Sequence, residues 1–432
     1  MGLWLVLVML AVLFTPSFRV MGTVPVRADD VLIFFGFGYY ISKRLVVLKM
    51  PRLDSVAFSS FLVIASIAVS TLFVSLSSSG SITAKEYLDV VRPLKWLFLY
   101  WMVADIDATK AMKLILRTLY ISWAILLALC ILEIVLGRFF PNMALAQFLS
   151  SFRNGGDWDA VSSYMDKRPF ATLESPTSLG YLATIGIFLS QLLEEKRKRR
   201  IFAAISSALL ILTMTRTFFF ALPLLFVCYE IARSDNWKTA IKGVLVSVRV
   251  LVVLLLVALV VMPIISPSVT DLTFGVFSTV SSGNATEDFS IGNRIANLSL
   301  VVMTWNQAPL LGVATRAYLP DFVDSELIIT FHRYGLFGLC ALLSVYPAGM
   351  LMAWRLRRQN REMAASIMTT LMITFLYGIT QGALINSREG VIPYIILGVL
   401  SSAARCPSGQ PHRDGIRSLL LPSSTSLIQP AP

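Results

Sequence analysis

The sequence contains little charge. Only 14% of its 432 residues are charged, against 56% that are hydrophobic, whereas a soluble domain carries about 25% charged residues because its surface faces water. A soluble globular protein is therefore excluded, and lipid must cover much of the surface. The net charge is +12, and its distribution along the chain predicts membrane topology rather than binding to nucleic acid.

Cysteine is also scarce. The sequence has four cysteines and no Cys-X-X-Cys pair. Cys130, Cys228 and Cys340 lie inside apolar runs, and Cys406 lies in the tail. This spacing supports neither a disulfide framework nor a zinc site. The tripeptide Asp157-Trp158-Asp159 has the DxD form of metal-dependent sugar transferases, but such tripeptides are common by chance. We expect no metal and no cofactor.

What the sequence has in abundance is long apolar runs. A helix that spans a bilayer needs about 20 predominantly apolar residues, because its backbone must be hydrogen-bonded internally. About twelve segments approach this criterion, so we expect an all-α integral membrane protein. They cover approximately 3–18, 31–41, 55–76, 91–104, 118–136, 178–193, 201–215, 218–232, 244–264, 327–354, 364–385 and 391–404. Residues 1–405 then form one multi-pass membrane domain, and the polar residues 406–432 form a disordered cytoplasmic tail.

Lysine and arginine predict the orientation, because basic loops stay on the cytoplasmic side. If the helices alternate strictly, the strongly basic loops all fall on one side, including the run Lys196–Arg200 and the arginines from Arg355 to Arg361. Both termini are then cytoplasmic. Two long loops, about 138–177 and 266–326, become periplasmic, and loops this long usually carry function. Within the second loop, the apolar segment 295–305 is expected to form a helix on the membrane surface.

Five arginines lie at or near the outer ends of the expected helices. A guanidinium group matches phosphate oxygens with a rigid fork of donors, so these arginines are candidates for binding a lipid-linked phosphate. The alternative is that each side chain only reaches the lipid headgroups. The five are Arg168, Arg216, Arg294, Arg316 and Arg388.

Two acidic residues at the start of the segment 327–354 are candidate proton acceptors. Asp324 and Glu326 precede a long apolar helix, where partial loss of water can make a carboxylate a useful base. The alternative for Asp324 is an N-cap. His332 lies inside the apolar run and is interpreted as a core histidine with satisfied hydrogen bonds more readily than as a catalyst.

Four stretches resemble the bacterial O-antigen polymerase and O-antigen ligase superfamily. The first runs from Arg168-Pro169-Phe170 to Gly180, and the second ends in Thr215-Arg216. The third leads from Gly292-Asn293-Arg294 to Pro309-Leu310-Leu311-Gly312. The fourth leads from Asp324-Ser325-Glu326 to Gly335 and Gly338. Together they make about 169–398 the core that resembles the family.

The resemblance implies a metal-independent membrane glycosyltransferase in the bacterial inner membrane. Its substrate is an oligosaccharide on undecaprenyl pyrophosphate, polymerised into O-antigen, capsule or exopolysaccharide. Its partners are membrane lipid, a chain-length regulator and a flippase, and not nucleic acid. Arg216 would stabilise the leaving pyrophosphate, Asp324 or Glu326 would accept the proton, and Arg168, Arg294, Arg316 and Arg388 would contact substrate.

Three alternatives stay open. Ligases of this superfamily carry a histidine where this sequence has Asp324, which favours a polymerase over an O-antigen ligase. A flippase or other transporter usually places ionisable residues near the middle of the membrane, whereas here most of them fall at outer boundaries and in loops. A receptor or scaffold would tolerate loss of the outer arginines.

Overall fold

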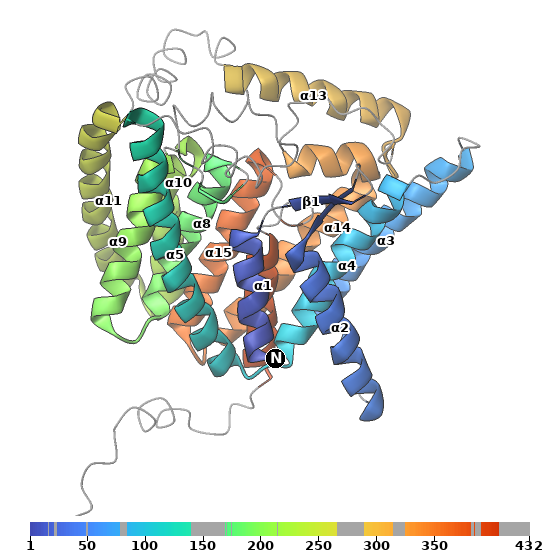
Figure 1. Ribbon diagram of the computed structural model, residues 1–432, viewed down its shortest axis with the longest axis horizontal. Coiled ribbons are helices and arrows are strands. Elements are labelled where there is room, and N and C mark those ends of the chain that lie inside the picture. The colour runs from blue at the N-terminus through green and yellow to red at the C-terminus, as the bar shows by residue number, and fades with distance from the viewer. Residues whose placement is uncertain are drawn as a thin grey trace, which may run out of the picture.

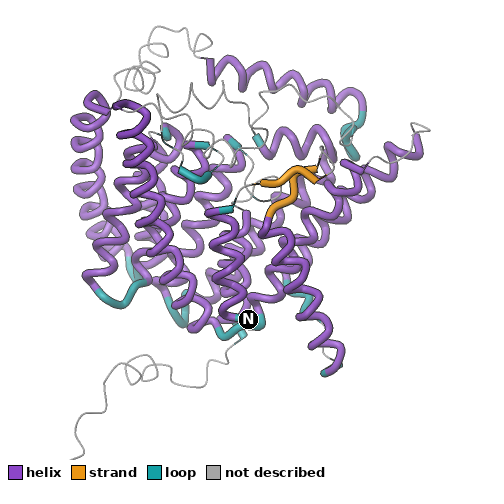
Figure 2. The backbone as a smooth tube through the Cα atoms, in the orientation of Figure 1, coloured by secondary structure: helices purple, strands orange, loops and turns teal. Residues whose placement is uncertain are grey.

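The computed structural model describes the backbone of residues 1–15, 17–20, 24–48, 51–77, 84–139, 169, 171–173, 175–213, 215–265, 289–313, 325–381, 384 and 390–405. These residues form a helical bundle with one short hairpin (Figures 1 and 2). Among them, four helices are long and apolar enough to cross a membrane: α3, α5, α14 and α15. The chain is therefore a helical membrane protein.

Each apolar segment expected from the sequence overlaps a helix. The helices are α1 Gly2–Phe14, α2 Ala28–Val46, α3 Ser55–Ser77, α4 Ala84–Ala104, α5 Ala108–Phe139, α8 Pro176–Leu189, α9 Lys196–Thr213, α10 Arg216–Arg233, α11 Trp237–Ile265, α13 Phe289–Gln307, α14 Glu326–Leu356, α15 Arg361–Thr380 and α16 Val391–Ala403, with a 3₁₀ turn η1 at Ser190–Leu192. That about twelve of them span the membrane stays a prediction.

Several predicted boundaries differ from those of the helices, among them the ends of the segments 3–18 and 364–385. The first segment was expected to remain helical to residue 18, but α1 ends at Phe14, and Ser17–Val20 (β1) pairs with Val24–Arg27 (β2) in an antiparallel hairpin. The segment 364–385 ends as a helix at Thr380. In both places the hydrophobicity continues past the helix, so composition alone cannot mark its end.

The core lies between helices that are distant in sequence. α14 packs against α3 and α15, α8 packs against α9, and α16 packs against α4. Large buried side chains fill the spaces between them, among them Trp96, Trp123 and Tyr181. Figure 1 shows α13 lying across one end of this bundle rather than along it. The sequence predicted a surface helix at 295–305, and the helix found there is longer.

Basic residues gather at one end of the bundle. This end, called the basic end here, gathers the short loops seen at the bottom of Figure 2. Ion pairs join these loops: Arg233 to Glu362 at 2.9 Å, Lys113 to Glu194 at 3.6 Å, and Arg405 to Asp105 at 3.2 Å. The exposed run Lys196–Lys198 lies at this end too. The structure describes several of the loops that are expected to be cytoplasmic, and these loops share one end of the bundle.

Candidate functional site

The opposite end, called the site end here, is where α8, α10 and α14 begin and α9 and α15 end. Hydrogen bonds tie these helix ends together. The Thr215 hydroxyl donates to the carbonyl of Pro176 at 3.2 Å, and the Glu326 backbone N–H donates to the carbonyl of Gln381 at 3.4 Å. Because the Ser175 hydroxyl also lies 3.4 Å from the Gln381 side chain, three helix amino ends meet at one place, where the positive ends of their dipoles favour an anion.

The first two stretches of the resemblance pack directly against each other. Ser175 caps α8 by accepting a hydrogen bond from the Ser178 N–H at 3.1 Å. One turn along, a Cβ placed on Gly180 would lie 2.4 Å from Oγ1 of Thr215. Only glycine lets α8 approach the turn between α9 and α10 this closely. The turn at Thr215 and the start of α8 from Pro176 to Gly180 are thus parts of one structural unit.

The third and fourth stretches also meet, through two glycines with positive φ. Gly312 has φ +69° and Gly335 has φ +64°. A Cβ on Gly335 would lie 2.3 Å from the Leu310 carbonyl oxygen, so glycine is required there for both conformation and space. The Leu336 N–H donates to the Pro309 carbonyl at 2.8 Å. α14 is therefore broken at Gly335, and the turn 309–313 fits into the break.

Two buried carboxylates each hold a segment at this end. Glu326 is 0% exposed, and both of its oxygens lie within 3.0 Å of the Leu384 N–H. Glu133 on α5 is 1% exposed and accepts a hydrogen bond from the Ala171 N–H at 3.0 Å. A carboxylate that accepts backbone N–H groups is stabilised in its charged form. These contacts make Glu133 and Glu326 anchors for the segments that follow Arg168 and precede Arg388 in sequence.

A network of side chains connects α8 with α15. Ser178 shares a hydrogen bond with the Tyr377 hydroxyl at 2.9 Å, and Tyr181 shares one with Thr374 at 3.0 Å. The rings of Tyr181 and Tyr377 stack with centroids 4.3 Å apart. Sequence analysis did not select these residues. Serine, threonine and tyrosine inside apolar helices give no signal of whether they face lipid or another helix.

The predicted site residues are only partly visible in this arrangement. Arg216 is the first residue of α10, after Thr215 at the N-cap, and Arg294 lies within α13. The side chains of both, and the whole of Arg168, Arg316, Arg388 and Asp324, lie outside the described residues. The N-cap position of α14 belongs to Ser325. Ser325 makes no side-chain capping hydrogen bond, and both interpretations of Asp324, as an N-cap and as a proton acceptor, stay predictions.

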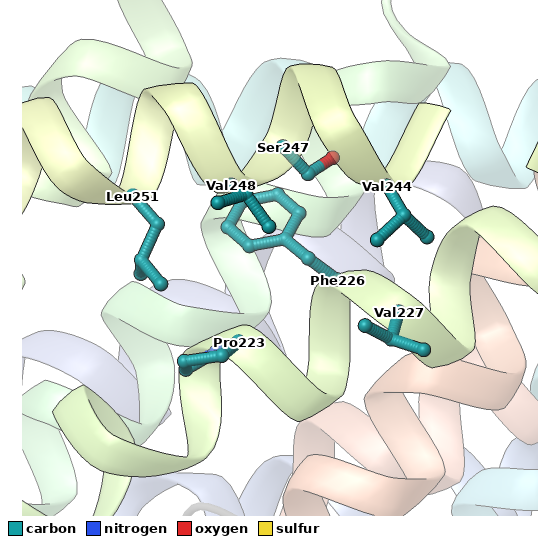
Figure 3. Close-up of a pocket in the computed structure, with 7 residues that line it drawn as sticks. All are labelled: Pro223, Phe226, Val227, Val244, Ser247, Val248 and Leu251. Atoms are coloured by element: carbon teal, nitrogen blue, oxygen red, sulfur yellow. The ribbon is translucent and has the colours of Figure 1, made fainter. Parts of the chain in front are cut away.

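A small cavity lies away from these groups, between α10 and α11. Its empty volume is about 180 Å³, and it is lined by Pro223, Phe226, Val227, Val244, Ser247, Val248 and Leu251. Figure 3 shows Ser247 as the single polar side chain among them. The lining offers no charge and no general acid or base, so the cavity is suited to apolar contacts and not to the chemistry.

Ionisable residues are also buried along α2 and α4, which sequence analysis did not expect. The Lys95 side chain is 7% exposed, and its ammonium nitrogen lies 2.6 Å from Asp30 and 3.5 Å from Asp29. The expectation that ionisable groups lie mostly at outer boundaries is therefore incomplete. The signal was available, since an ionisable residue within an apolar helix is by default a candidate for function.

No protein-family model matches this chain, and no curated protein matches it either. Among the described residues, no three side chains of histidine, cysteine, aspartate or glutamate are grouped so as to hold a metal ion.

Proposed function

We propose that this protein is a membrane glycosyltransferase that polymerises oligosaccharide repeat units carried on undecaprenyl pyrophosphate. One observation carries the proposal. The four stretches that resemble the polymerase and ligase superfamily are distant in sequence, yet they pack in two pairs at the same end of the bundle. Sharing an end follows from the alternation of the helices, so it is the close contacts of Gly180 with Thr215 and of Gly335 with Leu310 that support the proposal.

The chemistry assigned to this end is a single displacement. The bond from the anomeric carbon to the pyrophosphate breaks, and its electron pair leaves with the pyrophosphate. The acceptor sugar hydroxyl forms the new bond to that carbon and gives its proton to a carboxylate. Arg216, with the α10 amino end behind it, stabilises the negative charge that grows on the leaving group. Arg168, Arg294, Arg316 and Arg388 complete the contacts with phosphate and glycan.

The proton acceptor proposed here is Asp324 rather than Glu326. The buried Glu326 carboxylate already accepts a hydrogen bond from the Leu384 N–H. Glu326 is therefore assigned the role of positioning the segment at Leu384, and not that of accepting a proton. Asp324 also stands where ligases carry a histidine, which favours polymerase over ligase. We place the protein in the bacterial inner membrane with the site end facing the periplasm, so that the basic end faces the cytoplasm.

Reconstitution tests the activity directly. Purified full-length protein is placed in liposomes with lipid-linked single repeat units, and products on the carrier are separated by size. Chains of two or more repeats are the expected result. Transfer that occurs only after a second acceptor lipid is added would instead identify a ligase, and absence of any joined product would contradict both.

A lipid-linked oligosaccharide flippase is the second candidate. The buried Lys95 with Asp29 and Asp30 favours it, because transporters use ionisable groups inside the membrane. In the same liposomes, repeat units that cross the bilayer without being joined would support the flippase. Loss of that crossing in Lys95→Ala, with polymerisation absent throughout, would establish it.

A further inference from the structure

His332 is held rigidly at the break in α14. Its ring is fully buried, three residues before Gly335. Its backbone carbonyl accepts a hydrogen bond from the Val313 N–H at 3.0 Å, and Nδ1 of its ring lies 2.6 Å from the Thr304 hydroxyl oxygen on α13. Beside this contact, the rings of Trp305 and Phe331 stack with centroids 6.5 Å apart. The ring therefore has one fixed orientation between α13 and α14.

The hydrogen bonds of Thr304 indicate the tautomer of His332. With its only hydrogen directed to the Leu300 carbonyl at 2.8 Å, the Thr304 hydroxyl accepts from His332. In this assignment Nδ1 carries the proton of a neutral imidazole. Nε2 is left with a lone pair and can act only as an acceptor.

That lone pair has no partner. Within the part of the chain that the structure describes, Nε2 of His332 is buried and receives no hydrogen bond. On the same turn of α14, Oγ1 of Thr330 and the donor Nε–H of Arg333 are also buried without a partner among the described residues. Buried polar atoms in native proteins are nearly always paired, so such an atom calls for a ligand or an ordered water. The expectation of a core histidine with all its hydrogen bonds satisfied is thus confirmed at Nδ1, whereas no partner of Nε2 lies among the described residues.

We propose that Nε2 of His332 is a subsite that accepts a hydrogen bond from a hydroxyl of a bound sugar. This inference rests on the proposed function and adds to it a residue that recognises the glycan. The ligand class is a neutral polyol, because the nitrogen offers a lone pair and no charge.

Two substitutions separate this role from a structural one. In His332→Asn the side-chain amide can still donate to Thr304, but nothing replaces the acceptor at Nε2. In His332→Gln the amide oxygen can reach the position of Nε2. We expect His332→Asn to raise the KM for lipid-linked repeat units about tenfold, the effect of one lost hydrogen bond. His332→Gln should raise it less, with kcat nearly unchanged in both. A His332→Asn protein with wild-type KM would show that the contact with Thr304 is the only role of the ring and would overturn the proposal.

A spectroscopic measurement tests the subsite without any turnover. The chain has two histidines, so His412→Ala labelled with ¹⁵N-histidine reports on His332 alone. We expect the spectrum to show one protonated ring nitrogen and one ring nitrogen with a free lone pair. The resonance of the second nitrogen should shift when glycan repeat units are added that were released by mild acid from the host's surface glycan. A resonance that does not move at saturating glycan would mean that Nε2 contacts at most a water and would overturn the subsite. Loss of this shift with polymerisation intact refutes the subsite alone, whereas absence of polymerisation in wild type refutes the proposed function.

Discussion

Burial of a carboxylate costs several kcal/mol unless its oxygens accept hydrogen bonds. Glu326 is placed at the start of α14, where its two oxygens accept from the Leu384 N–H and the positive end of the helix dipole lies nearby. Glu133 holds Ala171 in the same manner. At the scale of single residues, two buried carboxylates at the site end therefore hold backbone segments in place.

The Glu326→Gln variant removes this negative charge and retains the shape of the side chain. An amide oxygen is a weaker acceptor than a carboxylate, so we expect the free energy of unfolding to fall by about 1–3 kcal/mol. Thermal unfolding in detergent measures the change. The matched control is Glu362→Gln at the basic end, where the half-exposed carboxylate pairs with Arg233. There the loss should be at most about 1 kcal/mol. Equal losses in the two variants would contradict the anchoring role of Glu326.

At the scale of elements, the contact between Gly312 and Gly335 determines how α14 is built. Without the break, the segment before Gly335 would continue the axis of α14 and would not meet the turn 309–313. Each glycine leaves room for the backbone of the other, because a Cβ on either would lie within 2.6 Å of backbone atoms of the opposite segment. The break positions His332 and the start of α14 beneath α13.

Gly335→Ala tests this contact. At φ +64° and ψ −163°, Gly335 adopts a conformation that essentially only glycine takes and that costs an L-residue about 1–3 kcal/mol, and the close approach to Leu310 adds to it. We expect a marked fall in melting temperature and in the yield of folded protein. Gly38→Ala on α2 is the matched control, because a Cβ there would meet nothing within 4 Å. Its stability should be unchanged or higher by up to about 1 kcal/mol. A Gly335→Ala protein as stable as Gly38→Ala would refute the requirement for glycine.

The sequence predicted the helices better than it predicted where each helix ends and which other helices it packs against. Long apolar runs predict helices reliably, because in lipid the backbone has few alternatives. The hairpin at 17–27 and the break at Gly335 depend on contacts with distant segments, so the sequence around them gives no sign of either. Arg216 was selected correctly as a helix-end residue, since it separates two apolar runs. Glu133 and Lys95 were missed as buried groups, because hydrophobicity does not tell which face of a membrane helix meets protein.

At the scale of the whole molecule, the described basic loops and the candidate site lie at opposite ends of the bundle. This arrangement predicts that the two ends lie on opposite sides of the membrane. Lys198→Cys at the basic end and Asn306→Cys near the end of α13 are both exposed positions. In a background without the four native cysteines, a membrane-impermeant maleimide should label Asn306→Cys in cells with a permeabilised outer membrane. Lys198→Cys should react only after lysis. Labelling of both in unlysed cells would contradict the orientation.

The central claim is that the site end joins lipid-linked repeat units with Arg216 at the leaving pyrophosphate. Its most direct test is the ladder of surface glycan from a strain that lacks the gene and carries wild type, Arg216→Ala or Arg358→Ala. Arg358 is the control because it is exposed at the basic end, just after α14. At equal protein levels, we expect full ladders from wild type and Arg358→Ala, and collapse to a single repeat unit with Arg216→Ala. A full ladder with Arg216→Ala would contradict the claim.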